Sequence, residues 1–350
     1  MKWILLLLTA LMTLDPDYGS DSGYLTKNEK EVVCFVYHRF GDSRYPSTNV
    51  SAKDFEIHLK YLVENDFQVL TFSEAITYLQ SEQPSKKTAV ITIDDGYNGF
   101  FTNALPLLKK YDMPGTLFIN TKTVGGGDYM TWDELRDVVK HDVEIGNHTH
   151  SHDYFLNLPE TSRYKTFKDE IELSQSIIKK HLDIEPIVFS YPYGEFDVEM
   201  KKIVKQAGFV AAAAQNSGVM YAGLDIFQCP RFPMSEAYSS EKQFIEKTSM
   251  HALHIIDQSP TAFVLKEKNP PVLTLTLPGS DLNLKQFQCF VQGGECELKV
   301  LKTMDESVTI SLRARKPLSG RRRTLYTLTF RDNQGKWYWF SHLWINPNVH

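Results

Sequence analysis

Hydrophobic and polar positions follow two different rhythms along this chain. In the first two thirds, short apolar runs rich in Val, Ile and Phe alternate with longer segments in which apolar residues recur every three or four positions. The short runs are typical of buried strands, and the longer spacing is typical of amphipathic helices. The expected strands are residues 32–37, 67–70, 89–93, 115–119, 143–146, 186–189 and 209–214. Strands that alternate with helices pair in parallel, so the pattern predicts an α/β fold, a closed or incomplete (β/α) barrel.

After about residue 262 the apolar positions alternate with a period of two. Turn residues separate these runs and no helical spacing intervenes, which is typical of a small all-β sandwich. The runs are residues 272–277, 286–291, 297–301, 308–312, 325–330 and 337–341. Asn269, Pro270 and Pro271 mark the boundary. The predicted organisation is a signal peptide and linker over residues 1–20, an α/β domain over 30–258 and a C-terminal β-sandwich domain over 262–350.

The N-terminus predicts export. Lys2 precedes an apolar run that continues through Leu14, which resembles a secretory signal peptide and is too short to span a bilayer. No cysteine follows it, so a lipid anchor is not expected. We therefore expect a periplasmic, cell-surface or secreted protein with no membrane span in its mature chain.

The charge of the chain argues against nucleic acid as a partner. The formal net charge is −5, and no run of five basic residues occurs. The densest basic cluster, Arg321 to Arg323, is expected to be a solvated turn.

The four cysteines agree with export. Cys289 and Cys296 flank a Gly-Gly turn between two strand-like runs, which predicts a disulfide across a hairpin. Cys34 and Cys229 lie in apolar segments and could pair with each other or remain two buried thiols. No cysteine has the C-x-x-C spacing of a metal site.

Two adjacent carboxylates end the most apolar strand. Asp94 and Asp95 follow the run 89–93, and Gly96 permits the turn that lets both side chains converge. Because neighbouring anions repel, one of them lowers its cost by binding a cation.

Two histidines supply further metal ligands. His148 and His152 are four residues apart, the spacing that places two side chains on one face of a helix. With one strand-end aspartate they form a His₂Asp set, whose open fourth position is typical of a catalytic site for zinc or a similar metal. His150 would point elsewhere on a helix and stays an alternative ligand.

Five polar residues share one location in the predicted fold. Each is expected where a strand ends and a loop begins, the edge at which barrel enzymes gather their chemistry. They are His38, Asp94, Asp95, His148 and Tyr193.

Three motifs resemble a known enzyme family. The segments Thr92 to Gly96, His148 to His152 and Tyr191 to Gly194 are similar, in type and order, to those of carbohydrate esterase family 4, the NodB-like polysaccharide deacetylases. The resemblance covers residues 32–257. It implies a distorted (β/α) barrel and removal of acetyl groups from N-acetylated sugars with a divalent metal, Zn²⁺ being expected and Co²⁺, Ni²⁺ or Mn²⁺ being alternatives.

The resemblance also implies roles for individual residues. Asp95, His148 and His152 would hold the metal and Asp94 would be the general base. The backbone N–H of Tyr193 would bind the oxyanion. Tyr191 and Trp132 would contact the polysaccharide.

This sequence departs from the common family pattern in two places. Ser190 occupies the position of an arginine that orients the base, and Arg231 is our candidate replacement. His251 and His254 lack the leucine that precedes the family's C-terminal acid histidine by two residues. Both departures resemble the poly-β-1,6-N-acetylglucosamine deacetylases, whose acid histidine lies on an N-terminal strand, as His38 does here.

The expected function is therefore N-deacetylation of an N-acetylglucosamine exopolysaccharide, the β-1,6-linked polymer of biofilms, with release of acetate. The alternatives are a deacetylase for β-1,4-linked peptidoglycan or chitin oligomers and an inactive sugar-binding protein. The β domain could bind carbohydrate or dock a cell-envelope partner. Trp337, Trp339 and Trp344 could form a stacking face there, but alternating aromatic residues favour a structural role in the core.

Overall fold

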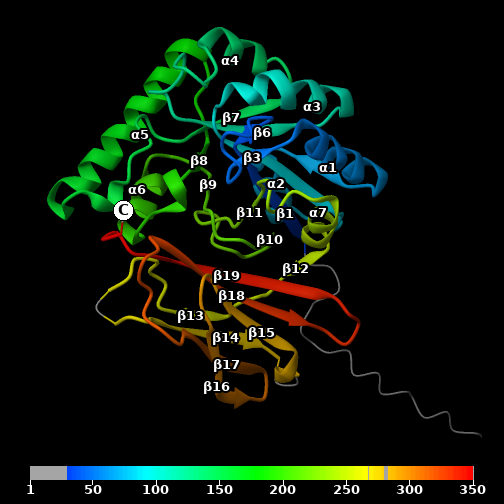
Figure 1. Cartoon of the computed structure of the whole chain (residues 1–350), viewed down its shortest axis with the longest axis vertical. Coiled ribbons are helices and arrows are strands. Elements are labelled where there is room, and N and C mark those ends of the chain that lie inside the picture. The colour runs from blue at the N-terminus through cyan, green and yellow to red at the C-terminus, as the bar shows by residue number, and fades with distance from the viewer. Residues whose placement is uncertain (1–29, 267, 280–282, 350) are drawn as a thin grey trace, which may run out of the picture.

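The computed structural model describes residues 30–266, 268–279 and 283–349. The predicted signal peptide lies outside these residues. Within them the chain forms one large curled sheet with helices around it and two smaller sheets at one end of the molecule (Figure 1). In this part of the chain, no helix has the length and apolar character needed to cross a membrane.

The large sheet is mainly parallel and positions the polar strand ends. Its order in the described residues is β10-β1-β5-β6-β7-β8-β9, with β4 beside β5 and β11 beside β1. Its strands are β1 (Glu31–Tyr37), β4 (Gln68–Leu70), β5 (Thr88–Asp95), β6 (Gly115–Ile119), β7 (Val143–Asn147), β8 (Val188–Ser190), β9 (Ala211–Ala213), β10 (Val219–Tyr221) and β11 (Phe232–Pro233). The predicted α/β architecture is confirmed as a curled half-barrel. The carboxyl ends of the parallel strands meet at one edge.

Helices follow most of these strands and cover the sheet. They are α1 (Ala52–Glu64), α2 (Phe72–Gln80), α3 (Leu105–Tyr111), α4 (Trp132–Val138), α5 (Glu160–Leu182), α6 (Val198–Gln206) and α7 (Glu241–Thr248). Short segments connect them: β2 (Arg39–Phe40), β3 (Asn49–Val50), the π-helical turn η1 (Phe100–Ala104) and the 3₁₀ turns η2 (Phe155–Asn157) and η3 (Pro192–Gly194). Capping residues in the sequence determine where some of these helices begin. Thr71 and Thr131, for example, form capping boxes with Glu74 and Glu134.

A short segment spans the gap between the last and first parallel strands. Cys229 pairs with Ala213 of β9, and Phe232 pairs with Phe35 of β1. The segment between them carries Arg231, which is fully buried. This fully buried arginine therefore comes from the segment that bridges the two ends of the half-barrel.

Both faces of the large sheet are buried. Ile91 and Ile93 of β5 join one apolar cluster with α1 and α3, whereas Val90 joins another with α2. Because alternate side chains of a strand point to opposite faces, a strand buried on both sides appears in the sequence as a continuous apolar run. This burial explains why β5 was predictable from residues 89–93.

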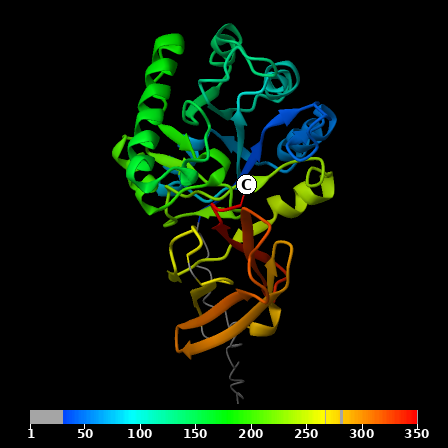
Figure 2. The same cartoon turned by 60° about the vertical axis from the view of Figure 1, so that its left-hand side comes forward.

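The two smaller sheets pack face to face. One has the order β12-β19-β18-β15 and the other β13-β14-β17-β16 in the described residues. Their strands are β12 (Met250–Ala252), β13 (Asp257–Ser259), β14 (Val272–Pro278), β15 (Phe287–Val291), β16 (Cys296–Met304), β17 (Ser307–Ala314), β18 (Arg323–Arg331) and β19 (Trp337–Ile345), with the 3₁₀ turn η4 (Leu284–Gln286) before β15. Leu275, Ile310 and Tyr326 lie between the sheets in a shared core. Figure 2 shows both sheets at one end of the molecule, away from most of the helices.

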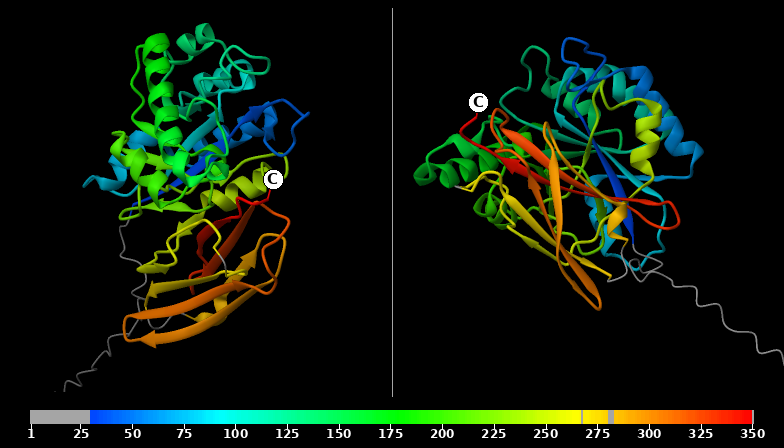
Figure 3. Two further views of the ribbon diagram at one scale, coloured as in Figure 1. Left: turned by 90° about the vertical axis from the view of Figure 1, so that its left-hand side faces the viewer. Right: turned by 60° about the horizontal axis from the view of Figure 1, so that its bottom comes forward.

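Two of these strands precede the predicted domain boundary. β12 pairs in parallel with β19, and β13 pairs with β14, although both come before residue 262. Strands of three residues carry too few positions for a period-two pattern, so the sequence did not reveal them. In Figure 3 the long strands β18 and β19 run across the end of the half-barrel region.

The four cysteines and Trp344 have structural roles. Cys289 and Cys296 form a disulfide with their Cα atoms 5.7 Å apart, whereas Cys34 and Cys229 are buried free thiols. Trp344 is buried in the sandwich core.

Candidate active site

The two adjacent aspartates point in different directions because the chain turns between them. Asp95, the last residue of β5, and Gly96, which follows it, both have positive φ angles, 76° and 79°. This turn sends the carboxylate of Asp94 into the protein interior and that of Asp95 toward the loop that follows β7. The left-handed backbone at a non-glycine residue is a local cost that the surrounding structure must offset.

The two histidines lie on a loop, so the expectation of a helical pair is wrong. His148 follows β7 directly, and both Thr149 and His152 have positive φ angles, which a regular α-helix does not adopt. Other side chains occupy the backbone donors of this loop. The Asn147 side chain accepts the Thr149 N–H at 2.8 Å, and the Glu170 carboxylate accepts two further N–H groups, those of His150 and Ser151.

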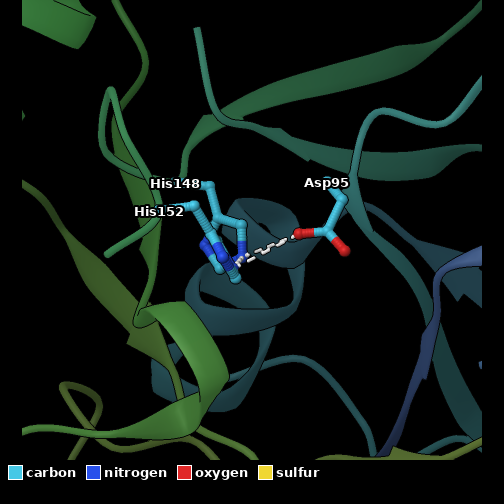
Figure 4. A group of neighbouring side chains, drawn as sticks. All are labelled: Asp95, His148 and His152. Carbon is cyan, nitrogen blue, oxygen red and sulfur yellow. Dashed lines mark hydrogen bonds and ion pairs between the residues drawn. The ribbon is translucent and has the colours of Figure 1, made fainter. Parts of the chain in front are cut away.

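Asp95, His148 and His152 nevertheless converge (Figure 4). The His148 and His152 Nε2 atoms are 3.1 Å apart, and they lie 3.5 and 3.3 Å from Asp95 Oδ1. Three ligands of a tetrahedral zinc ion with bonds of about 2.0–2.1 Å are about 3.3 Å from one another. The set therefore fits a small divalent cation in both donor type and spacing.

A hydrogen bond fixes the orientation of His148. Its Nδ1 lies 2.7 Å from the carbonyl oxygen of Ser190 at the end of β8. Because a carbonyl only accepts, Nδ1 must carry the proton, which leaves the lone pair of Nε2 directed at the cluster. His150 lies outside the set, since its Nδ1 is bonded to the hydroxyl of Thr121.

Electrostatics keep Asp95 ionised. Burial alone would raise the pKa of Asp95, but the hydrogen bond with His148 and the charges of His38 and His152 hold that pKa well below its usual range. Burial and the charge of His148 lower the pKa of His152 to about 4. Burial opposes the charged form of His148 as well, but its bond to Asp95 and the charges of both aspartates raise the pKa of His148.

Asp94 is held by Arg231 in a buried, two-pronged ion pair. Arg231 Nη1 and Nη2 each lie 2.8 Å from a different oxygen of Asp94, and both side chains are fully buried. Burial alone would raise the pKa of Asp94, but the charge and hydrogen bonds of Arg231, together with the charges of His148 and His38, lower the pKa of that carboxyl. The remaining guanidinium donors bind Thr92, Ser190 and the carbonyl of Ala214.

The position of Ser190 explains how the arginine can come from elsewhere. The Ser190 hydroxyl is 3.3 Å from Asp94 Oδ2 and accepts a hydrogen bond from Arg231 at 3.0 Å. A small side chain here leaves room for a guanidinium that enters from the segment before β11. Arg231 thus binds Asp94, the general base predicted from the sequence.

His38 lies at the same end of the sheet, whereas the two rival histidines do not. His38 follows the last residue of β1, and its charge contributes to lowering the pKa of Asp95. His251 instead binds Glu31, the first residue of β1, and His254 stacks on Tyr221 of β10. β1 rises about 3.3 Å per residue, so its two ends are about 20 Å apart.

Tyr193 contacts the cluster, but Tyr191 does not meet the expectation of a substrate contact. The Tyr193 ring lies 4.4 Å from that of His152. Tyr191 is fully buried: its ring stacks on Phe196 and its hydroxyl donates to the carbonyl of Phe227, so it cannot face a polymer at the surface.

Trp132 is partly buried at the start of α4. It packs against the main core and stacks on the ring of His181 at 4.4 Å. Its contact with the polysaccharide stays a prediction.

A cavity formed by the segments that follow β1 and β5 was not predicted. It measures about 330 Å³ and includes Arg39, Tyr97 and Asp128 in its lining. The Arg39 guanidinium lies between the rings of Tyr45 and Tyr97, 3.9 and 3.6 Å from their centres. The only feature of the sequence that could have indicated a role for Arg39 is its position directly after His38.

The basic cluster near residue 322 was interpreted wrongly. Arg322 is not a solvated turn residue, because its side chain is 10% exposed and pairs with Glu195, which is 3% exposed. The partners are 127 residues apart in the chain, so no local pattern could have indicated the contact.

Comparisons with known proteins agree with this geometry. Residues 81–212 match the family model described as Polysaccharide deacetylase. The chain is 28% identical over 222 residues to a protein named putative polysaccharide deacetylase YxkH from Bacillus subtilis, covering 63% of this chain and 77% of that protein. It is 26% identical over 215 residues to the poly-β-1,6-N-acetyl-D-glucosamine N-deacetylase of Staphylococcus aureus, covering 58% and 73% of the two chains.

Solved structures share the fold. IcaB from Ammonifex degensii superposes with a TM-score of 0.56 at 25% identity, over 63% of this chain and 97% of that one. The deacetylase PplD of Streptococcus pyogenes gives a TM-score of 0.57 at 19% identity, over 63% and 99%. Residues 81–212 therefore form a polysaccharide deacetylase domain, which makes the protein a hydrolase that acts on amide carbon–nitrogen bonds.

Proposed function

We propose that this enzyme removes acetyl groups from the N-acetylglucosamine units of an exopolysaccharide, poly-β-1,6-N-acetylglucosamine, with a divalent metal held by Asp95, His148 and His152. The observation that carries the proposal is the Asp94–Arg231 pair beside the His₂Asp cluster, with His38 at the same strand edge. The names of the Staphylococcus aureus and Ammonifex degensii relatives support the β-1,6-linked polymer.

The metal is proposed to be Zn²⁺, because two imidazoles and one carboxylate suit its preference for nitrogen and oxygen ligands. When bound, it would supply a Lewis acid that polarises the acetyl carbonyl and lowers the pKa of water.

Asp94 is the proposed general base. Its ionised carboxylate would accept the proton of the water that attacks the acetyl carbon, and Arg231 would hold that carboxylate in one orientation. The backbone N–H of Tyr193 would donate to the oxygen that becomes negative in the tetrahedral intermediate.

His38 is the proposed general acid. The carbon–nitrogen bond breaks easily only if the sugar nitrogen receives a proton, and His38 would donate it from the end of β1. The products are acetate and a glucosamine unit with a free amine. The apolar run after Lys2 supports action outside the cytoplasm, where such polymers accumulate.

Acetate release from defined oligomers tests this proposal. Metal-loaded wild type is expected to deacetylate β-1,6-linked N-acetylglucosamine oligomers, and both Asp94→Asn and His38→Ala are expected to lose at least about 100-fold in kcat. His251→Ala is the matched control and should retain activity, because His251 lies at the other end of β1.

Other outcomes would select another function. Release from β-1,4-linked oligomers alone would indicate a peptidoglycan or chitin deacetylase. Binding of oligomers without release from either series would indicate an inactive sugar-binding protein. Full activity in His38→Ala would remove His38 from the mechanism.

A further inference from the structure

We propose that the C-terminal β region completes the active site, with Arg323 acting as a positioning residue for Tyr193 and, through Tyr193, for the metal ligand His152. The inference rests on the proposed function for the role of the metal. It does not require the β-1,6 linkage.

Arg323 is the first residue of β18 and reaches the loop that follows β8. Its Nη1 donates to the carbonyl oxygen of Tyr193 at 3.0 Å, and its guanidinium lies 5.5 Å from the centre of the Tyr193 ring. Tyr193 has a φ of 59°, a left-handed conformation that needs support from its surroundings. A charged donor on its carbonyl supplies that support, since such bonds are stronger than those between neutral groups.

Tyr193 in turn contacts His152, one of the three proposed metal ligands. Its ring meets the His152 ring edge to face at 4.4 Å, and it stacks on Tyr154 at 3.8 Å. His152 itself has a positive φ, and its imidazole is partly exposed. Its Nε2 contacts His148 and Asp95, and its backbone N–H donates to the hydroxyl of Thr149. The Tyr193 ring adds a packing contact to the imidazole from outside the ligand set.

Arg322 binds the same loop at a second point. Its Nε and Nη2 bind the two oxygens of Glu195 at 2.7 Å each, and its guanidinium lies 4.3 Å from the centre of the Tyr154 ring. Glu195 follows Tyr193 by two residues and is nearly fully buried. A buried carboxylate without its cation is strongly unfavourable, so the loop after β8 needs the β region to hold its position.

The contacts around a metal ligand set its affinity and orientation. Loss of such an outer contact typically costs 10–100-fold in metal affinity or activity. We therefore expect Arg323→Ala to weaken Co²⁺ binding by roughly tenfold and to lower kcat by roughly tenfold with little change in KM. The effect falls on kcat because Arg323 acts on the orientation of the reacting groups.

The test uses the full-length protein and Co²⁺ as a spectroscopic probe. Co²⁺ titration followed by visible absorption reports on the ligand geometry without substrate, and acetate release gives kcat and KM. Arg323→Lys keeps a cationic donor and is expected to recover at least part of the loss. Arg321→Ala is the matched control, an exposed arginine two positions away, and should match wild type.

Two results would overturn the inference. One is wild-type Co²⁺ affinity, spectrum and kcat in Arg323→Ala. The other is an equal loss in Arg321→Ala, which would indicate a general charge effect. If wild type releases no acetate from any oligomer, the proposed function fails, but the Co²⁺ comparison still decides whether Arg323 positions the cluster. If Arg323→Ala does not fold, Arg323→Lys and Tyr193→Ala decide: unchanged Co²⁺ affinity in both would reject the role of this contact.

Discussion

At the scale of single residues, the most informative contact is the buried pair of Asp94 and Arg231. The sequence indicated Arg231 only as a candidate for a vacant role, because residues 94 and 231 are far apart in the chain and no spacing connects them. The contact becomes understandable once the bridging segment is seen to cross between β9 and β1. Ser190 then leaves the space that a larger side chain would fill.

Replacing Arg231 tests whether this pair supports both the fold and the chemistry. Arg231→Ala leaves Asp94 buried without a cation, so we expect a loss of about 3–5 kcal/mol in the free energy of unfolding. We also expect kcat to fall by roughly 100-fold. Urea unfolding and acetate release measure the two effects. Arg315→Ala breaks an exposed ion pair with Glu295 and should cost less than about 1 kcal/mol. Equal stabilities of the two variants would contradict the assigned role of Arg231.

His58 gives a prediction for pH. It is buried between the Tyr37 hydroxyl and the Ser239 carbonyl and stacks on Phe244, and burial lowers the pKa of His58 to about 4. The folded protein keeps His58 neutral, while the unfolded chain protonates it below about pH 6.5. The neutral, buried His58 therefore contributes fully to the free energy of unfolding above about pH 6.5, and this contribution is lost progressively as the pH falls from 6.5 to about 4.

Urea unfolding at pH 7, 6, 5 and 4, in the presence of chelator, measures this contribution. The slope from His58 is expected to approach about 1.4 kcal/mol per pH unit within that window. His58→Gln should flatten the dependence. An unchanged slope in that variant would show that His58 titrates normally in the folded protein.

At the scale of elements, strand ends were predictable and loop geometry was not. Continuous apolar runs such as residues 89–93 identify doubly buried strands, and parallel pairing then brings their polar ends together. The spacing of His148 and His152 suggested a helix, but the Asn147 side chain competes for the backbone donor of Thr149 and the Glu170 carboxylate for those of the next two residues. Both histidines reach the cluster because the loop is fixed, an arrangement that hydrophobic periodicity does not encode.

Glu170 therefore should influence the metal without touching it. Its carboxylate accepts the N–H groups of His150 and Ser151 from α5, so Glu170→Ala is expected to weaken Zn²⁺ binding by roughly tenfold. Isothermal titration of the chelator-treated protein with Zn²⁺ measures this change. Glu172→Ala, an exposed glutamate on the same helix, is the control and should bind as wild type does. Comparable losses in both variants would argue against a specific role for the loop contacts.

At the scale of the whole molecule, the β region is joined to the half-barrel by many contacts. Glu31 of β1 accepts the N–H of Ala252 and binds His251 in β12, while Trp339 of β19 packs against Phe232. The period-two pattern correctly predicted a β-sandwich but could not show that β12 and β13 enter it. Both strands pair with strands of the β region although they directly follow α7 in the sequence.

We accordingly expect the two regions to unfold together. In Trp132→Phe, the tryptophan fluorescence of the described residues comes from the β region alone, whereas circular dichroism at 222 nm reports mainly on the helices of the half-barrel. Coincident urea midpoints for the two signals are the expected result. Midpoints that differ by more than the error of the fits would indicate two independent domains.

The central claim is that Asp95, His148 and His152 hold one divalent metal that the deacetylation requires. Its most direct test is acetate release by chelator-treated enzyme as Zn²⁺ is added in fractions of an equivalent. We expect activity on β-1,6-linked oligomers to rise in proportion to the metal and to stop rising at one equivalent, with no activity regained by His148→Ala. Full activity before any metal is added, or an unchanged response in His148→Ala, would contradict the account.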